Sequence, residues 1–401
     1  MAALAGAAST TFVGGCAASY GSRSSYLTPI LKPENQDTIT YWMDVMMQQV
    51  RDQRIPPPRA AYNFAMPLAA GFLAANGIVK AYDTPFGVAD GPDDADAELA
   101  YATAFGIAAA EVFQQPFVME RTAFRRRFPS GTAKDRAINY GRAVGYHVVR
   151  MRTNDGSEAN KVNFYLDRYQ RREDSLKWTP TGPYYSALPG PAFPTYSRPL
   201  FPGAGKIKPW TMKSEGQFRS DDFYDPRSPE FAEEFENIRT LGGADSTIRT
   251  EDESEIALFW EDGPWGITPP GHFLLIAIQV LQDKPMTFIE RARAFALMGM
   301  TQSDAAVNAW DNKYHYDIIR PETAIRSRAS AFNNPDDRVK AQRNWRSYIP
   351  TPEFPAYTSG HSTFGGVGVE ITKLFLGTSK VSFSHESPDQ VLVVNKAVTV
   401  A

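Results

Sequence analysis

Two cations stand close together on a segment with helical character. Lys313 and Arg320 are seven residues apart, so on one helix they would project from nearly the same side after two turns. We expect this helix to begin near Ser303 and to continue to Arg320, where Pro321 stops it. The pair predicts a site for an anion. A solvated basic face with a Lys313–Asp317 ion pair is the alternative interpretation.

A second stretch, residues 354–362, reads FPAYTSGHS and carries groups that suit the same anion. Ser359 can donate a hydroxyl hydrogen bond, Gly360 a backbone N–H, and His361 can transfer a proton near neutral pH. The helix expected after His361 would direct its N-terminal dipole and free N–H groups at a bound anion. The alternative is a capped turn with a structural histidine.

Other candidate residues carry less chemistry. The stretches 203–206 (GAGK) and 365–368 (GGVG) lack the spacing or context of nucleotide loops. We expect His147 and His272 to be packed and His315 to lie on a different side of its helix from Lys313. No cluster of His, Asp and Glu has the spacing of ligands to a divalent metal ion.

Composition excludes several classes of partner. The 401 residues are 43% hydrophobic and 22% charged, with a formal net charge of -3, so neither nucleic acid nor an anionic membrane is indicated. The single cysteine, Cys16, leaves the redox compartment undecided. The longest strongly apolar run, residues 272–281, is too short to cross a bilayer. The first twenty residues lack the basic start of a secretory signal. We expect a soluble protein whose location stays open, with export to the periplasm or outside the cell compatible with the sequence.

Periodicity predicts a mainly α fold, a helical bundle with a long Pro-rich surface loop. We predict helices over 60–76, 97–114, 133–152, 253–262, 271–282 and 286–300, a last helix from His361 to Gly377, and strand-favouring residues from about 381. Four regions follow: a flexible N-terminus (1–40), a helical scaffold (41–155), a Pro- and aromatic-rich wrapping segment (156–250) and the anion-site region (251–401).

Taken together, the two stretches resemble the first two signature motifs of vanadium-dependent haloperoxidases and the related type-2 phosphatidic acid phosphatases. The first is Lys313-x6-Arg320-Pro321 and the second is Ser359-Gly360-His361. Their order and context, with RPETAIR after residue 319 and FWEDGPWGITPPGH at 259–272, resemble the bacterial haloperoxidase branch. The similarity extends from about residue 60 to 385.

The resemblance implies a function and roles for these residues. It implies bound vanadate that activates hydrogen peroxide, which oxidises a halide to hypohalous acid; this halogenates a small organic substrate. Lys313 would polarise the peroxide, Arg320 would neutralise an oxygen of the anion, Ser359 and Gly360 would hydrogen-bond it, and His361 would be the acid/base. Trp310 and Phe354 match halide-pocket positions, and both are equally interpretable as core aromatics. A homodimer is compatible with the resemblance.

One part of the family pattern is missing. The third motif, an arginine followed by a histidine that ligates vanadium, has no match, because no arginine follows Arg346 and the only later histidine, His385, lacks the motif's context. We therefore expect a chain that is incomplete at its C-terminus or impaired, with His385 not the ligand. Two other functions stay open: an acid phosphatase that holds phosphate in the same socket, and a non-catalytic anion-binding or scaffold protein.

Overall fold

The computed structural model describes residues 36–157, 169–170, 172, 174–180, 199–263, 266–388 and 399–400. Within these ranges the chain is mainly helical, as the sequence predicted. The α-helices are α1 (Thr38–Gln53), α2 (Pro57–Val79), α3 (Ala97–Phe113), α4 (Val118–Arg125), α5 (Thr132–Met151), α7 (Pro229–Leu241), α8 (Glu251–Phe259), α9 (Thr268–Leu281), α10 (Phe288–Tyr316), α11 (Pro321–Thr323) and α12 (Gly360–Leu376). Short 3₁₀ or π turns are η3 (Pro85–Gly87), η4 (Ala204–Lys206), η5 (Ala324–Arg328) and η6 (Ala329–Phe332), and β1 (His385–Glu386) pairs antiparallel with β2 (Thr399–Val400).

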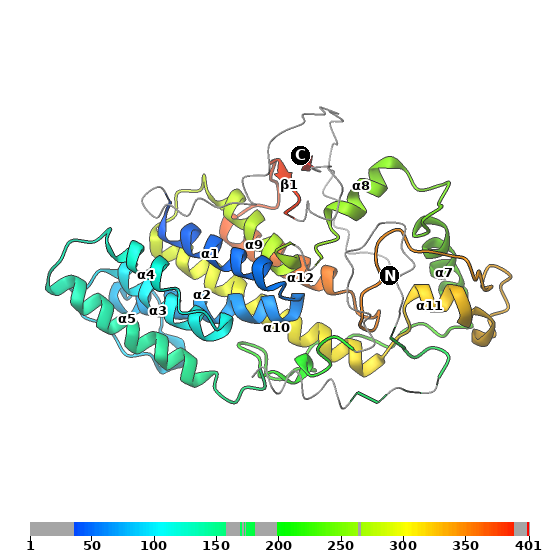
Figure 1. The fold of residues 1–401 in the computed structure, drawn as a ribbon, viewed down its shortest axis with the longest axis horizontal. Coiled ribbons are helices and arrows are strands. Elements are labelled where there is room, and N and C mark those ends of the chain that lie inside the picture. Colours follow the sequence, from blue (N-terminus) through cyan, green and yellow to red (C-terminus); the bar gives the residue numbers. More distant parts are fainter. Residues whose placement is uncertain are drawn as a thin grey trace.

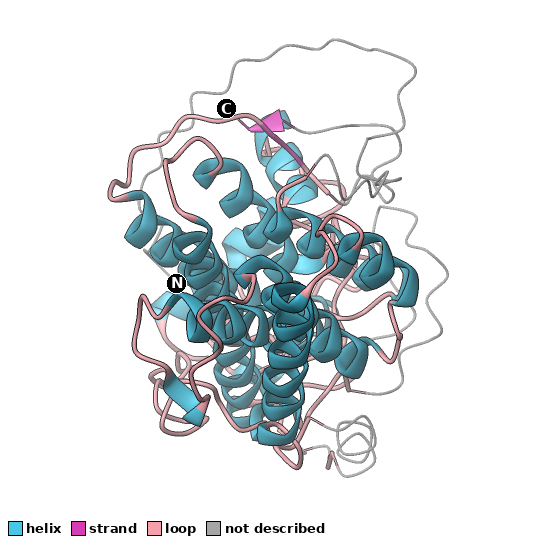
Figure 2. Ribbon diagram, turned by 90° about the vertical axis from the view of Figure 1, so that its left-hand side faces the viewer, coloured by secondary structure: helices cyan, strands magenta, loops and turns pink. Residues whose placement is uncertain are grey.

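The long helices α1, α2, α3, α5 and α10 run along the long axis of the molecule (Figure 1), and Figure 2 shows the bundle from its end. Their facing sides form the main hydrophobic core. Small residues set the closest approaches: a Cβ added at Gly141 of α5 would lie 2.5 Å from the carbonyl oxygen of Ala100 in α3. The helices predicted over 60–76, 97–114 and 133–152 are therefore confirmed, and α1 is an additional helix.

Helix α2 is long and apolar enough to cross a membrane by length and composition alone. The longest strongly apolar run in the sequence, residues 272–281, lies instead in the shorter helix α9. In the structure, 89% of the apolar window of α2 is buried inside the protein, between α3, α5, α9 and α10. This packing accounts for its apolar composition as that of a core helix.

Helix α10 differs from its prediction at both ends. A single helix spans Phe288–Tyr316, beginning with a capping box between Thr287 and Glu290, so the expected start at Ser303 is wrong. No Gly or Pro separates the two predicted segments, and Ser303 is buried inside the helix. With nothing to break the backbone ladder there, the helix continues.

The end of α10 at Tyr316 removes Arg320 from the helix, which contradicts the predicted two-cation face. Asp317 is left-handed (φ 56) and its backbone N–H caps the carbonyl of Lys313. Its carboxylate accepts a hydrogen bond from the hydroxyl of Tyr169 at 2.8 Å, and its carbonyl accepts one from the backbone N–H of Trp178, also at 2.8 Å. Lys177 thus forms an antiparallel β-bridge with Ile318, flanked by backbone hydrogen bonds between Trp178 and Asp317 and between Ile319 and Leu176. Tertiary pairing, not Pro321, ends the helix.

A second hydrophobic cluster lies at one end of the bundle, around α7 and α11, at the right of Figure 1. Its members are Phe231, Ala232, Phe235, Ile318, Ile319, Ala324, Ile325, Ala329, Phe332, Val339 and Trp345. The helix α7 was not anticipated, although Ser228 caps it and Pro229 begins it. Within the predicted wrapping segment, residues 158–168, 171, 173 and 181–198 lie outside the described residues, as do residues 1–35 of the predicted flexible N-terminus.

Candidate functional site

A cavity of about 370 Å³ opens between the C-terminal end of α10, the N-terminal end of α12 and the second hydrophobic cluster. It brings together residues from both sequence stretches. Lys313, Arg320, Ser359, Gly360 and His361 all line it, as do Trp310 and Phe354. The residues singled out for chemistry therefore share one cavity, although α10 does not carry Arg320.

Lys313 lies on the last turn of α10 with 1% of its surface exposed. Its ammonium donates to the carbonyl oxygens of Pro355 (3.2 Å), Ala356 (3.3 Å) and Thr358 (2.5 Å), so the loop before α12 is anchored on this cation. Among the described residues no carboxylate pairs with it, and the predicted Lys313–Asp317 alternative is not what forms. Burial, and then the nearby charge of Arg320, holds the pKa of Lys313 well below its ordinary value.

Arg320 reaches the cavity from the extended segment after α10. Its Nε donates to the carbonyl oxygen of Phe354 at 2.5 Å, and its guanidinium carbon lies 4.6 Å from the centre of the Phe354 ring. Its Nη2 is buried with no hydrogen-bond partner. Burial lowers the pKa of Arg320 to about 10, partly offset by Glu353, so the guanidinium is charged at neutral pH. A buried donor without a partner is costly unless a ligand satisfies it.

Ser359 and Gly360 form the start of α12. Ser359 is the N-cap, and its hydroxyl oxygen accepts from the backbone N–H of Ser362 at 3.2 Å, which leaves the hydroxyl proton able to donate elsewhere. Gly360 is the first helical residue, so its N–H has no partner within the helix. A Cβ at Gly360 would meet Trp310 at 3.7 Å and Lys313 at 4.0 Å, which is ordinary contact. The protein's own packing therefore does not require glycine there.

His361 lies on the exposed side of the first turn of α12 and faces the cavity. Surrounding protein desolvates the imidazole and lowers its pKa, and Lys313 acts in the same direction. Asp262 and the backbone of Glu261 oppose this by favouring the imidazolium. The net lowering of the pKa of His361 favours the neutral imidazole, the state that can accept a proton.

The other histidines lie elsewhere. His147 is part-buried on α5 and bonds the carbonyl of Phe86 at 2.8 Å, and His315 is exposed. His272 is fully buried, with Nδ1 2.8 Å from the carboxylate of Asp262. His385 stacks on His272 with ring centres 5.1 Å apart and bonds Gln279. It does not line the cavity.

Trp310 and Phe354 pack with ring centres 5.1 Å apart. Trp310 is 1% exposed and its indole N–H donates to the carbonyl of Leu200 at 3.2 Å. Phe354 is half-buried, and the ammonium of Lys313 lies 4.9 Å from its ring centre. Both aromatics thus belong to the packing around the cations and also reach the cavity wall.

Two acidic residues near the site were not singled out from the sequence. Burial raises the pKa of Glu353 to about 7 even though Arg320 opposes the shift. Asp262 acts on His361 from the turn between α8 and α9. Glu353 directly precedes Phe354, which offered a local signal, whereas nothing in the sequence connects Asp262 with His361, because their electrostatic interaction arises only on folding.

The C-terminal part of the chain, residues 293–401, matches a family model described as the VCPO second helical-bundle domain. The vanadium chloroperoxidase of Curvularia inaequalis is 27% identical over 174 residues, covering 38% of this chain and 28% of that protein. The chain therefore spans less than a third of the length of this relative.

Solved structures share the fold. A bacterial vanadium-dependent iodoperoxidase superposes with a TM-score of 0.71 at 22% identity, covering 92% of this chain and 86% of the other. A bacterial vanadium-dependent chloroperoxidase in its apo form superposes with a TM-score of 0.60 at 15% identity, covering 86% and 85%. The family model over residues 293–401 and the sequence match support the superfamily of vanadium-dependent haloperoxidases and type-2 phosphatidic acid phosphatases, and the solved structures share its fold.

Proposed function

We propose that this chain carries the anion-binding core of a vanadate-dependent haloperoxidase, which oxidises a halide with hydrogen peroxide to hypohalous acid and halogenates organic molecules. One observation carries the proposal: Lys313, Arg320, Ser359, Gly360 and His361 line a single cavity. The likeness to the superfamily suggests the class of reaction. The geometry provides a site in which an oxyanion would accept hydrogen bonds from donors that lack a partner, such as Nη2 of Arg320.

The donors in the cavity fit a tetrahedral oxyanion. The buried Nη2 of Arg320 lacks a partner, the hydroxyl of Ser359 can donate, and the N–H of Gly360 opens the helix α12. Vanadate held there would supply activation of hydrogen peroxide toward a halide. Arg320 would neutralise charge on the anion. His361, whose lowered pKa favours the neutral imidazole, would accept a proton from peroxide and later return it to the oxygen that departs as water.

Before Lys313 can polarise peroxide, its ammonium must give up one of its present hydrogen bonds. Its three N–H groups are directed at three loop carbonyls. A bound anion would favour the charged ammonium and raise its pKa, and the ammonium must exchange one carbonyl for an oxygen of the ligand. The residues 355–358 that supply these carbonyls directly precede Ser359, so binding and loop geometry are coupled.

None of the described residues is proposed as the direct vanadium ligand. His361 is the only imidazole among the described residues that line the cavity, and the resemblance gives it the acid/base role. His385 contacts His272 and Gln279, and no role in the site is assigned to it.

The test is vanadate-dependent bromination. Orthovanadate, hydrogen peroxide and bromide are added to the protein, and bromination of a phenol-type dye is followed; turnover that requires vanadate supports the proposal. Hydrolysis of a phosphomonoester without peroxide would support the phosphatase instead. Oxyanion binding with neither reaction would leave an anion-binding protein, and the haloperoxidase proposal would be rejected.

Arg320→Ala tests whether the cavity itself holds the anion. Removing one charge-assisted contact should weaken vanadate or phosphate binding about 10- to 100-fold, measured by isothermal titration calorimetry. Arg338→Ala is the control, because Arg338 pairs with Asp336 at 2.7 Å and does not line the cavity. Equal effects of the two substitutions would remove Arg320 from the site.

A further inference from the structure

Glu353 lies next to the wall of the cavity but is not part of it. Pro352 and Phe354, on either side of it in the chain, line the cavity, whereas Glu353 does not. Its side chain is part-buried, and among the described residues no side chain hydrogen-bonds its carboxylate. Carboxylates are seldom buried without such a partner. An oxyanion also repels a nearby carboxylate, so this position bears on how the cavity binds an anion.

The backbone at Glu353 is held against α10. Its carbonyl accepts a hydrogen bond from the backbone N–H of Leu200 at 2.9 Å. The carbonyl of Leu200 in turn accepts from the hydroxyl of Tyr314 at 2.8 Å and from the indole N–H of Trp310 at 3.2 Å. These contacts keep residue 353 beside the C-terminal end of α10, close to the cations of the cavity.

Arg320 is attached to the same segment. Its Nε donates at 2.5 Å to the carbonyl oxygen of Phe354, the residue that follows Glu353, and its guanidinium carbon lies 4.6 Å from the centre of the Phe354 ring. Its Nη2 is buried without a partner, so Glu353 does not bond this atom. The charge of Glu353 therefore acts on Arg320 through space, while Nη2 remains available to a ligand.

The two charged groups favour each other's ionised forms. Burial raises the pKa of Glu353 to about 7, and Arg320 opposes this shift. Burial lowers the pKa of Arg320 to about 10, and Glu353 opposes that shift, followed by Tyr314. Tyr314 is neutral near pH 7, because burial holds its pKa well above its ordinary value. Of these three groups, only Glu353 changes its charge close to neutral pH.

We propose that Glu353 is a positioning residue that controls how much of the charge of Arg320 is available to an oxyanion in the cavity. Ionised Glu353 competes with the anion for the guanidinium and repels the anion, whereas protonated Glu353 does neither. Anion binding is therefore accompanied by proton uptake at Glu353, and the affinity falls as the pH rises through about 7. This role rests on the oxyanion site of the proposed function and is the same whichever reaction occurs there.

Sulfate is the probe, because it is a tetrahedral dianion whose own charge does not change near neutral pH. Its affinity is measured by isothermal titration calorimetry at about pH 6 and about pH 8, on either side of the pKa of Glu353 at about 7. Glu353→Gln keeps the shape of the side chain without the charge. It should bind sulfate like the unchanged protein at the lower pH and about five- to tenfold more tightly at the higher pH.

Proton uptake is a second readout, one that a merely structural role would not change. Sulfate binding near pH 7 is measured in two buffers of different ionisation enthalpy, which gives the number of protons taken up. The unchanged protein should take up more protons than Glu353→Gln does. His361 and Lys313, whose pKa values are lowered, contribute uptake of their own in both proteins, so the difference between the two reports on Glu353.

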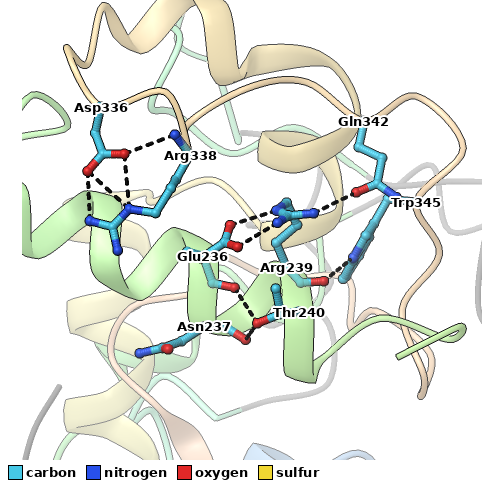
Figure 3. A network of polar contacts seen from close by, with 8 residues as sticks. All are labelled: Glu236, Asn237, Arg239, Thr240, Asp336, Arg338, Gln342 and Trp345. Atoms are coloured by element: carbon cyan, nitrogen blue, oxygen red, sulfur yellow. Dashed lines mark hydrogen bonds and ion pairs between the residues drawn. The ribbon is translucent and has the colours of Figure 1, made fainter. Parts of the chain in front are cut away.

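Glu236→Gln is the matched control, because it removes a carboxylate beside another arginine. Figure 3 shows Glu236 paired with Arg239, at 2.5 Å, and neither residue lines the cavity. This variant should bind sulfate as the unchanged protein does at both pH values. Glu353→Asp keeps a carboxylate and should retain the fall in affinity between the two pH values. If Glu353→Asp lost that fall as Glu353→Gln does, the effect would be structural and the proposal would be overturned.

The failure of this role and that of the proposed function are distinguishable. If Arg320→Ala weakens sulfate binding but Glu353→Gln keeps the pH dependence and the proton uptake of the unchanged protein, Glu353 has no such role and the oxyanion site stands. If Arg320→Ala leaves sulfate binding unchanged, the site itself is rejected, and the proposed function with it.

Discussion

At the scale of residues, the main feature is Lys313, whose ammonium pairs with no carboxylate among the described residues. Lys313 is buried on α10, close to a second cation, Arg320. Three carbonyl dipoles contact its ammonium but offset only part of the cost of burial. An arrangement that costs stability without a ligand is typical of a site that gains stability when an anion binds.

This cost predicts a pH dependence of stability. The pKa of Lys313 is lowered well below 10.5 in the folded state, so between the folded pKa and 10.5 the unfolded state binds more protons. The free energy of unfolding should therefore rise with pH in this window, by at most about 1.4 kcal/mol per pH unit. Lys313→Met should lack this contribution. Urea-unfolding curves at a series of pH values below 10.5 compare the two slopes.

Slopes are compared because the substitution also leaves carbonyls at Pro355, Ala356 and Thr358 without their donor. That loss shifts stability by a constant that does not depend on pH. Equal slopes in the two proteins would mean that Lys313 keeps an ordinary pKa, and the account of a strained buried cation would then be wrong.

His361 provides a second prediction at this scale. Desolvation lowers its pKa below 6.5, and Lys313 contributes to the same shift. NMR titration of the imidazoles should give a midpoint below 6.5, assigned by its loss in His361→Gln. Added phosphate should raise that midpoint because an anion in the cavity favours the imidazolium. A midpoint that ignores phosphate, although phosphate binds, would place the anion elsewhere.

At the scale of elements, the start of α12 combines an ordinary N-cap with space for a ligand. A Cβ at Gly360 would meet only ordinary contacts, and alanine favours helix. Gly360→Ala should therefore leave the melting temperature of the ligand-free protein unchanged or higher. The added methyl lies at the cavity rim beside Trp310 and Lys313, so phosphate should raise the melting temperature less than in the unchanged protein.

The measurement is thermal denaturation with and without phosphate. A fall in the ligand-free melting temperature would mean that Gly360 serves packing. An unchanged response to phosphate would mean that the anion does not approach the N–H of Gly360. The two outcomes separate a structural glycine from one that admits a ligand.

Elements also show what could be predicted from the sequence. The motif residues were identifiable by type and spacing, and α12 was placed closely because Gly377 ends it. The end of α10 could not be predicted, because it depends on contacts with Tyr169 and Trp178, which are far away in the chain. The same holds for the electrostatic effect of Asp262 on His361. Local signals predict where an element stops only when no tertiary contact overrides them.

At the scale of the whole molecule, the cavity lies beside the second hydrophobic cluster, and none of the described residues that line it is a member of the main core. The main core packs α1, α2, α3, α5, α9 and α10, and the second cluster packs α7 with residues 318–345. Residues of α10 and α12 line the cavity together with residues of the second cluster. Packing far along the bundle should therefore govern global stability without altering the site in the folded protein.

Gly141→Ala tests this separation. The new Cβ would lie 2.5 Å from the carbonyl oxygen of Ala100 and 2.9 Å from Cβ of Thr103, so α3 and α5 must move apart. The free energy of unfolding should fall by about 1–3 kcal/mol, measured by urea unfolding, while phosphate affinity at a temperature where the variant is folded should stay the same.

Gly366→Ala is the matched control, because it adds the same methyl to a helix where nothing lies within 4 Å. It should raise the free energy of unfolding by about 0.5–1 kcal/mol through helix propensity. If Gly141→Ala weakened phosphate binding as strongly as it lowers stability, the bundle and the site would be one coupled unit. If both substitutions stabilised the protein, the close α3–α5 contact at Gly141 would not exist in solution.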